Sequence, residues 1–288
     1  MITKSNEEYS LKDFLRQINF ENPKLKKIDA LLCGSFRSSK TGIGFDFNEI
    51  REYKMGDDLR HISWSTTAKT GILHTKEYYA EKEVTTFFLI DISNSMFCGN
   101  KLEPFINLVA YLLNLSSSFS EKVGGLFFDS DIRGHFPLSM SKSQSNLMFQ
   151  SLMHVYNNIS TKITNSTNHT NLAQALELTK QYFQKKGLIF LISDFINLAG
   201  WEKNIYEMVK KQNLYSFQIY DPLDFILPKS GYLTLIDPET KKLCTVNTDN
   251  KALQETYRTL VKQKQDKLNK YLKSIGVSHF IVDINDLK

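Results

Sequence analysis

The chain has 288 residues, of which 41% are hydrophobic and 23% are charged. This composition supplies enough apolar side chains for a core and excludes general disorder. No apolar run approaches the ~20 residues that a membrane-spanning helix needs, and Met1–Ser10 lacks the pattern of a secretory signal. We therefore expect a cytoplasmic protein with no transmembrane segment, or one that sits peripherally at the inner membrane through its partners.

Charge and cysteine content exclude further classes of protein. The 36 basic residues exceed the 31 acidic ones by five, and the basic pairs fall mostly near predicted helix ends, where cations complement the helix dipole. Because nucleic-acid binders concentrate such charge in long runs or beside aromatic residues, we expect no nucleic-acid partner. The cysteines, Cys33, Cys98 and Cys244, are too few and too scattered for a disulfide framework or a cysteine-based zinc site.

The first 82 residues show no sustained hydrophobic period. Residues 5–18 and Leu25–Leu32 predict short helices, whereas residues 33–82 hold five glycines among aromatic and charged side chains. Such a stretch favours turns and hairpins over an independent core. We predict a small, hairpin-rich attachment segment over residues 1–82, packed on a larger domain of residues 83–288.

From Val84 onward, apolar strand-like runs alternate with helical patterns, which is the rhythm of an α/β fold. Core strands are predicted at Val84–Ile90, Val123–Phe128, Ile132–Leu138, Gly187–Ser193, Leu214–Tyr220 and Val277–Val282. Helices are predicted at Leu102–Phe119, Ser143–Tyr156, Asn171–Gln184, Trp201–Lys211 and Lys251–Ser274. A further hairpin is predicted from Gly231–Ile236 and Leu243–Val246, because an Asp-Pro pair between them favours a turn. This order indicates a doubly wound, mostly parallel sheet of about six strands with helices on both faces.

The helical period also predicts which side chains face the core. Within Ser143–Tyr156, we expect Leu147, Leu152 and Val155 to point inward. An apolar stripe of this kind is how a surface helix covers one face of a sheet.

Two common ligand motifs are approached but carry the wrong residues at essential positions. Gly34–Thr41 approaches a phosphate-binding loop, but Ser39 stands where that loop needs glycine, and the glycines that follow oppose a helix. Asp129–Gly134 begins like a calcium loop, but Arg133 takes a ligand position. We therefore expect neither a nucleotide site nor a calcium site.

The informative segment is the run Asp91-Ile92-Ser93-Asn94-Ser95, directly after a buried strand. In a doubly wound sheet, functional groups gather beyond the carboxyl ends of the strands, at the point where the strand order reverses. Alternate residues of a loop share a side, so one carboxylate and two hydroxyls can converge on one point. These hard oxygen ligands suit Mg²⁺.

Two further ligands are expected from neighbouring strand ends. Thr170 opens a predicted helix, and Asp194 ends the other strongly apolar strand, so both fall at the carboxyl edge of the sheet. Each residue also has an ordinary alternative role, because Asp91 suits a turn, Ser93, Ser95 and Thr170 suit helix caps, and Asp194 suits a loop. The joint placement favours a metal site.

This pattern resembles the metal-ion-dependent adhesion site of von Willebrand factor type A domains. The resemblance implies a divalent ion, Mg²⁺ or Mn²⁺, held partly through water by Asp91, Ser93, Ser95, Thr170 and Asp194. In that family the metal usually leaves one coordination position for an acidic side chain of a partner protein. The resemblance therefore implies a binding function.

The upstream segment resembles the bacterial family known as domain of unknown function 58, which couples such a segment to a von Willebrand A-like domain. The likeness rests on Gly42–Phe47, Arg51–Tyr53 and Gly56–Trp64, and it extends to the carboxyl end. Asp221-Pro222-Leu223-Asp224 resembles a D-P-x-E motif of the family, with Asp224 in place of glutamate. Many relatives carry transmembrane helices, and relatives are commonly encoded beside MoxR-type AAA+ ATPases, which implies such a partner.

The role of the charged upstream residues stays open between three interpretations. The three possible roles are a structural ion-pair network, a partner-binding surface and a phosphate-binding site. The residues concerned are Arg51, Asp57, Asp58 and Arg60, with Trp64 beside them. The structural interpretation has the advantage that paired charges beside a tryptophan suit a docked loop.

The leading hypothesis is a non-enzymatic, metal-dependent binding module that acts as an adaptor or assembly factor, with a MoxR-type ATPase or its client as partner. The first alternative is a magnesium-dependent phosphohydrolase or nuclease, which the sequence disfavours because D-x-S lacks the second carboxylate of D-x-D and no general base is evident. The second alternative is a structural scaffold whose site holds no metal.

Overall fold

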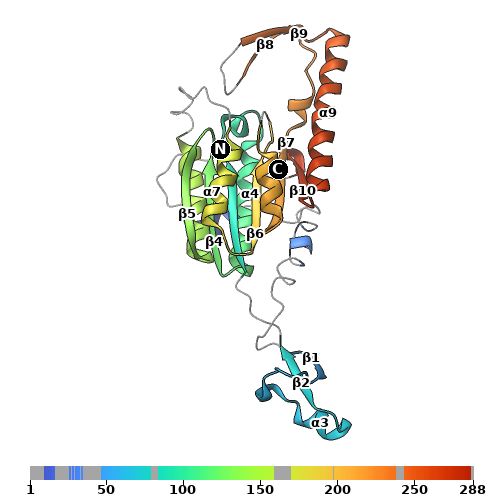
Figure 1. The fold of residues 1–288 in the computed structure, drawn as a ribbon. Coiled ribbons are helices and arrows are strands. Elements are labelled where there is room, and N and C mark those ends of the chain that lie inside the picture. The colour runs from blue at the N-terminus through green and yellow to red at the C-terminus, as the bar shows by residue number, and fades with distance from the viewer. Residues whose placement is uncertain are drawn as a thin grey trace. The chain divides into compact units, whose positions relative to one another are not determined.

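The computed structural model describes residues 10–16, 26, 28, 30–32, 34, 47–78, 84–158, 170–196, 198–237 and 243–286. The chain divides into two compact units, one of Met1–Leu25 with Thr85–Lys288 and one of Lys26–Val84 (Figure 1). The domain division into residues 1–82 and 83–288 stays a prediction, because a compact unit is defined by its contacts and is not shown to fold alone.

The unit Lys26–Val84 is built on an antiparallel hairpin of β1 (Phe47–Glu52) and β2 (His74–Tyr78). Between these strands lie the 3₁₀ helix η1 (Leu59–His61) and the helix α3 (Trp64–Thr70). Gly71 ends α3 with φ of 76°, a left-handed conformation that glycine adopts without steric cost. A hairpin is therefore confirmed within the predicted segment, although Met1–Leu25 group with the larger unit instead.

The larger unit, called the α/β unit below, contains a six-stranded sheet in the order β10-β7-β6-β3-β4-β5. Its strands are β3 (Thr85–Asp91), β4 (Lys122–Phe128), β5 (Ile132–Met140), β6 (Leu188–Ser193), β7 (Asn213–Tyr220) and β10 (Ser278–Asp283). All neighbours pair in parallel except β5, which lies antiparallel to β4 at the edge. In chain order this is the doubly wound arrangement 3-2-1-4-5-6, which confirms the predicted fold class.

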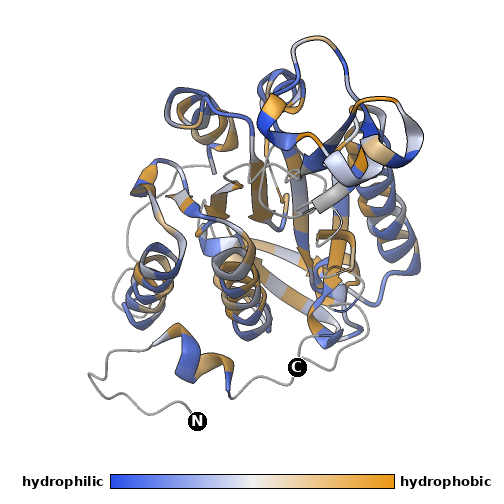
Figure 2. Cartoon of the chain, turned by 90° about the horizontal axis from the view of Figure 1, so that it is seen from below, coloured by the Kyte–Doolittle hydropathy of each residue, from blue (hydrophilic) through white to orange (hydrophobic). Residues whose placement is uncertain are grey.

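Helices cover both faces of the sheet. One face carries α4 (Leu102–Phe119) and α5 (Ser141–Asn157), with the short α1 (Leu11–Leu15) against them. The other face carries α7 (Leu172–Tyr182), α8 (Glu202–Val209) and the carboxyl end of α9 (Lys251–Ser274). In Figure 2 the strands are mostly orange and the helices alternate between blue and orange, so the core lies between the sheet and its helices.

The register of α5 differs from the prediction. Leu152 is buried as predicted, but the side chain of Leu147 is 49% exposed, and its neighbour Met148 is fully buried instead. The buried positions of this helix recur every three or four residues: Ser141, Gln144, Ser145, Met148, Phe149, Leu152 and Met153. Leu147 lies outside this stripe because it belongs to a consecutive apolar run with Met148 and Phe149, and those two residues are the ones in phase with Leu152 and Met153.

Four of the remaining elements lie between β7 and β10. The 3₁₀ helix η3 (Pro222–Phe225) leads to the predicted hairpin, formed by β8 (Tyr232–Ile236) and β9 (Leu243–Asn247). The helix α9 begins after Asn250, whose side-chain oxygen accepts hydrogen bonds from the first-turn amides. Two further 3₁₀ helices are η2 (Asn94–Phe97) and η4 (Ile284–Asp286).

Two further expectations concern membrane-spanning helices and disulfides, and the described residues bear on both. Among the described residues, no helix combines the length and the hydropathy that crossing a bilayer requires. Cys98 and Cys244 are exposed and form no disulfide, and Cys33 lies outside the described residues.

We expect Met148→Ala to lower the free energy of unfolding by about 2–5 kcal/mol, because this buried side chain leaves a cavity when it is truncated. Leu147→Ala is the adjacent control and should cost less than about 1 kcal/mol, because half of that side chain is already in solvent. Urea unfolding followed by circular dichroism measures both values. Equal losses in the two variants would contradict this register of α5.

Candidate functional site at the carboxyl edge of the sheet

The predicted site lies where the strand order of the sheet reverses, between β3 and β6. Asp91 is the last residue of β3, Ser193 is the last residue of β6, and the two strands pair in parallel up to Ile90 and Ile192. Asp194 follows directly. Connections leave these strands in opposite directions, so the strand ends line a crevice in which doubly wound proteins bind ligands.

Asp91 is almost completely buried, with 1% of its surface exposed. One carboxylate oxygen, Oδ1, accepts a hydrogen bond from the backbone N–H of Ser93 at 2.9 Å, and Oδ2 accepts one from the Ser193 hydroxyl at 2.7 Å. Burial raises the pKa of Asp91 to about 7, and the nearby charge of Asp194 adds to the shift. Asp91 therefore does accept a turn hydrogen bond, from the amide of Ser93, as the alternative interpretation expects. Its carboxylate also interacts with the charge of Asp194.

The loop after β3 brings the two predicted serine ligands together. Ser93 and Ser95 are both buried, and their hydroxyl oxygens lie 3.0 Å apart. The loop is anchored by the amide of Ile92, which donates to the carbonyl of Phe128 at the end of β4. Ser93 precedes η2, but its side chain makes no capping hydrogen bond, so the alternative role as a helix cap is wrong for this hydroxyl.

A tight turn holds Asp194 at the end of β6. Its Oδ1 accepts the amide of Ile196 at 3.0 Å, and the amide of Phe195 donates to the Ser193 hydroxyl at 3.0 Å. Phe195 has φ of 57°, which is uncommon for a large side chain, and its ring packs edge-on against Trp201. These contacts keep the strained turn in one conformation and so fix the direction of the Asp194 carboxylate.

Lys101 is the residue of this site that the sequence analysis missed. Its side chain is 2% exposed, and Nζ lies 3.0 Å from Asp194 Oδ2 and 2.8 Å from Asp224 Oδ2. Burial alone would lower the pKa of Lys101, but the two carboxylates outweigh that effect and raise it. Burial raises the pKa of Asp224, which the ammonium offsets only in part.

A signal for Lys101 was present in the sequence. Lys101 is the residue before α4, where the helix dipole disfavours a cation. A lysine directly before an apolar helix either extends into solvent or pairs with acidic residues from elsewhere in the fold, and the sequence alone does not decide between the two.

The motif Asp221-Pro222-Leu223-Asp224 is divided between two tasks. Asp221 is buried and accepts the amide of Leu223 at 2.9 Å, which caps η3, while Asp224 pairs with Lys101. A Cβ atom at Gly99, where φ is 65°, would lie 3.1 Å from Asp221 Oδ2. Glycine at this position therefore allows the loop before α4 to approach η3 closely.

Thr170 lies at the same edge of the sheet and is buried. The next residue, Asn171, donates its amide to the carbonyl of Asp129 just beyond β4, the neighbour of β3. The side chain of Asn171 caps α7 by accepting the amide of Gln174, so the alternative role of Thr170 as the N-cap is wrong. A direct approach of the Thr170 hydroxyl to the serine pair stays a prediction.

The geometry of this donor set is compatible with a small divalent ion. Adjacent oxygen ligands on an octahedral ion with bonds of about 2.1 Å are about 3 Å apart, and the hydroxyls of Ser93 and Ser95 have this separation. Nearby, the buried carboxylate of Asp194 contacts the ammonium of Lys101, and the buried carboxylate of Asp91 lies close enough to Asp194 for the two charges to interact. Within the described ranges, no group of three histidine, cysteine or acidic side chains is arranged to hold a metal, so an ion here would depend on hydroxyl oxygens.

The predicted partner-binding residues of the smaller unit form two local ion pairs. Arg51 makes a bidentate contact with Asp57, at 2.7 and 2.9 Å, which lowers the pKa of Asp57 to about 2. Arg60 contacts Asp58 at 2.6 Å, which lowers the pKa of that aspartate to about 2. Trp64 is 68% exposed. The structure therefore forms Arg51–Asp57 and Arg60–Asp58 as separate pairs.

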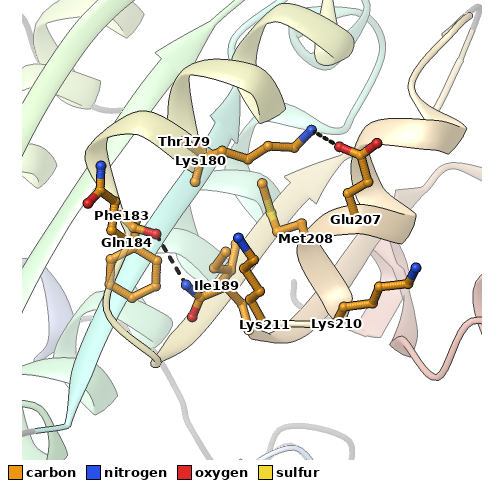
Figure 3. A pocket seen from close by; sticks show the side chains of 10 residues that line it. Thr179, Lys180, Phe183, Gln184, Ile189, Glu207, Met208, Lys210 and Lys211 are labelled. Atoms are coloured by element: carbon orange, nitrogen blue, oxygen red, sulfur yellow. Dashed lines mark hydrogen bonds and ion pairs between the residues drawn. The ribbon is translucent and has the colours of Figure 1, made fainter.

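Two hollows of the α/β unit differ in their relation to this site. One, of about 720 Å³, runs from Asp194 and Asp224 along α9 and has an aromatic lining that includes Phe225, Tyr257 and Tyr271. The other, of about 650 Å³, lies between α7 and α8 near the amino end of β6, where Lys180 pairs with Glu207 at 2.7 Å (Figure 3). Only the first, the α9 cleft, adjoins the candidate site.

Solved structures similar to this chain have low sequence identity to it. A conserved hypothetical protein, BatB, from Bacteroides thetaiotaomicron is 18% identical, with 69% of this chain and 90% of that chain covered and a TM-score of 0.42. A von Willebrand factor type A protein from Catenulispora acidiphila is 12% identical, with 49% and 34% covered and a TM-score of 0.36. The manganese-loaded TRAP protein of Plasmodium vivax is 14% identical, with 47% and 57% covered and a TM-score of 0.32.

The amino-acid sequence matches one protein family over most of its length. The model for the family described as protein of unknown function DUF58 matches residues 49–267, which is more than half of the chain. Uncharacterized proteins of Mycobacterium bovis and Mycobacterium tuberculosis are each 23% identical over 219 residues, which are 75% of this chain and 67% of the relative. The family match thus includes most of the β1–β2 hairpin and the whole stretch from Asp91 to Asp194.

We expect Ser193→Ala to destabilise the α/β unit by about 1–3 kcal/mol, because its hydroxyl satisfies a buried carboxylate oxygen of Asp91 and accepts the amide of Phe195. Ser118→Ala is the matched control; that exposed hydroxyl bonds only to a carbonyl of its own helix, so the loss should stay within about 0.5 kcal/mol. Urea unfolding measures the difference. A Ser193→Ala protein as stable as the control would show that Asp91 does not need this hydrogen bond.

Proposed function

We propose a function for this chain, which belongs to the family described as protein of unknown function DUF58. It is a non-enzymatic protein-binding module whose site at the carboxyl edge of the sheet binds Mg²⁺ or Mn²⁺. The observation that carries the proposal is the pair of buried hydroxyls, Ser93 and Ser95, 3.0 Å apart beside the buried carboxylate of Asp91. The position of these buried hydroxyls and carboxylates at the strand-order reversal supports a ligand site, because doubly wound proteins bind ligands there.

The residues that would hold the ion have distinct roles. Ser93 and Ser95 would coordinate the ion directly, exchanging the hydrogen bond between their hydroxyls for bonds to the metal. Asp91 and Asp194, whose oxygens accept hydrogen bonds from the surrounding fold, would act through water together with Thr170. When bound, the ion supplies a coordination position for an acidic side chain of a partner. The chain itself would orient that partner through the turn at Asp194 and the fixed loop after β3.

The α9 cleft supports a protein partner over a small ligand. It begins at Asp194 and Asp224 and continues along α9 past aromatic side chains and the cations of Lys264 and Lys267. Aromatic side chains beside a polar rim are characteristic of protein-binding surfaces. A partner carboxylate at the metal would therefore continue into a surface that contacts more of the partner chain.

The family resemblance adds a candidate partner and a location. We propose a MoxR-type AAA+ ATPase, or a client of it, as the partner, and the cytoplasm or the cytoplasmic side of the inner membrane as the location. In the smaller unit, Trp64 and the ion-paired Arg51 and Arg60 would provide a second contact, because exposed tryptophan and arginine are enriched where proteins bind one another.

The alternative of a phosphohydrolase or nuclease has less support. Hydrolysis needs a group that takes a proton from water, but both oxygens of Asp91 already accept protein hydrogen bonds and the group is 1% exposed. The Asp194 carboxylate is held in the same way, by Ile196 and Lys101. Both arrangements favour positioning an ion over catalysis.

Divalent metal should stabilise the protein through this site. At a Mg²⁺ or Mn²⁺ concentration one hundred times Kd, we expect the free energy of unfolding to rise by about 2.7 kcal/mol. Asp91→Ala should abolish the rise, whereas Asp266→Ala, on the exposed surface of α9, should retain it. Thermal unfolding with added metal or with chelator measures the effect. A wild-type protein that melts identically in both conditions supports the scaffold alternative instead.

Binding of the ATPase should depend on the same site. We expect purified, tagged wild type and Asp266→Ala to retain a purified MoxR-type ATPase of the same organism in Mg²⁺, and Asp91→Ala to lose it, because the ion would join the two proteins. Chelator should release the ATPase from wild type. Trp64→Ala should weaken retention without changing the metal response. Equal recovery by all four proteins, with and without chelator, rejects metal-mediated binding of this partner.

A further inference from the structure

A cation of the chain itself is already buried at the proposed metal site. The ammonium of Lys101 lies within 3.0 Å of Asp194 Oδ2 and within 2.8 Å of Asp224 Oδ2, and its side chain is 2% exposed. The remaining oxygen of Asp194 accepts the amide of Ile196. One of the proposed ligands is thus neutralised without any added ion.

The position of Lys101 is costly without these two partners. A buried ammonium needs paired charge and hydrogen bonds, and a helix start disfavours a cation; yet Lys101 stands directly before α4. An apolar residue would suit this place if the site had only to pack. Retaining a charge there is therefore best explained by what it does to the neighbouring carboxylates.

The other charged groups around Lys101 are acidic. Its two contacts are Asp224 of η3 and Asp194 of the turn after β6. Behind them, Asp91 at the end of β3 interacts with Asp194, and Asp221 lies beside the loop at Gly99. Lys101 is thus a cation that pairs directly with two of these carboxylates, Asp194 and Asp224. A divalent ion beside Asp194 would lie close to it, and two cations in a poorly solvated place repel each other strongly.

We propose that Lys101 is a specificity-determining residue that weakens the divalent-ion affinity of this site by occupying Asp194 and adding a positive charge. The proposal rests on the proposed metal site. It follows that the ion is held weakly by the chain alone and is retained when a partner adds its own carboxylate, which offsets the charge of Lys101. Metal and partner then bind cooperatively, since each favours the other.

The test is direct titration of Mn²⁺, with free Mn²⁺ followed by electron paramagnetic resonance. Lys101→Met keeps the length of the side chain and removes its charge, so we expect Kd to fall at least about tenfold relative to wild type. The double variant Lys101→Met with Asp224→Asn removes one buried carboxylate together with the ammonium, which protects the fold if the single variant is unstable. Its Kd for Mn²⁺ should also fall relative to wild type. Lys142→Met, an exposed lysine on α5, controls for net charge and should leave Kd unchanged.

The outcomes separate this inference from the proposed function. Tighter binding in the Lys101 variants that is lost again when Asp91→Ala is added supports the inference, even if wild type alone binds too weakly to measure. Unchanged or weaker Mn²⁺ binding in folded Lys101 variants overturns it. Wild-type binding that Asp91→Ala leaves intact contradicts the proposed metal site itself.

Discussion

Two carboxylates that end neighbouring parallel strands are the constraint on which the α/β unit depends. Asp91 and Asp194 come to the same edge because β3 and β6 pair in parallel at the reversal of strand order. Both are buried, so each must be satisfied by donors within the fold. Ser193, the turn amides and the ammonium of Lys101 supply those donors, and the hydroxyls of Ser93 and Ser95 in the loop after β3 hydrogen-bond to each other beside them.

Satisfying these charges joins parts of the chain that are distant in sequence. Lys101 links the loop before α4 to the turn after β6 and to η3. The carbonyl of Asp224 accepts the hydroxyl of Tyr257, which extends the connection to α9 and its cleft. A change of charge at the edge of the sheet would therefore act first on η3 and α9, because their hydrogen bonds and ion pairs connect them to Lys101.

Much of the fold was predictable because its signals are local. The bounds Leu102–Phe119 and Lys251–Ser274 agree with the structure, since long amphipathic helices carry their period within their own sequence. The apolar strands were equally clear. The inward position of Leu147 was wrong, because Leu147, Met148 and Phe149 are consecutive apolar residues and the packing of α5 decides which of them are buried.

The sequence by itself determined the class of the sheet and the candidate ligands, because buried strands and the polar residues after them are adjacent in the chain. Only the tertiary structure decided the charge balance of the site. Whether Lys101 lies in solvent or between Asp194 and Asp224 depends on three loops meeting from positions up to 123 residues apart. The energy of a buried charge is set by its neighbours in space, and those neighbours are fixed by strand order rather than by any local pattern.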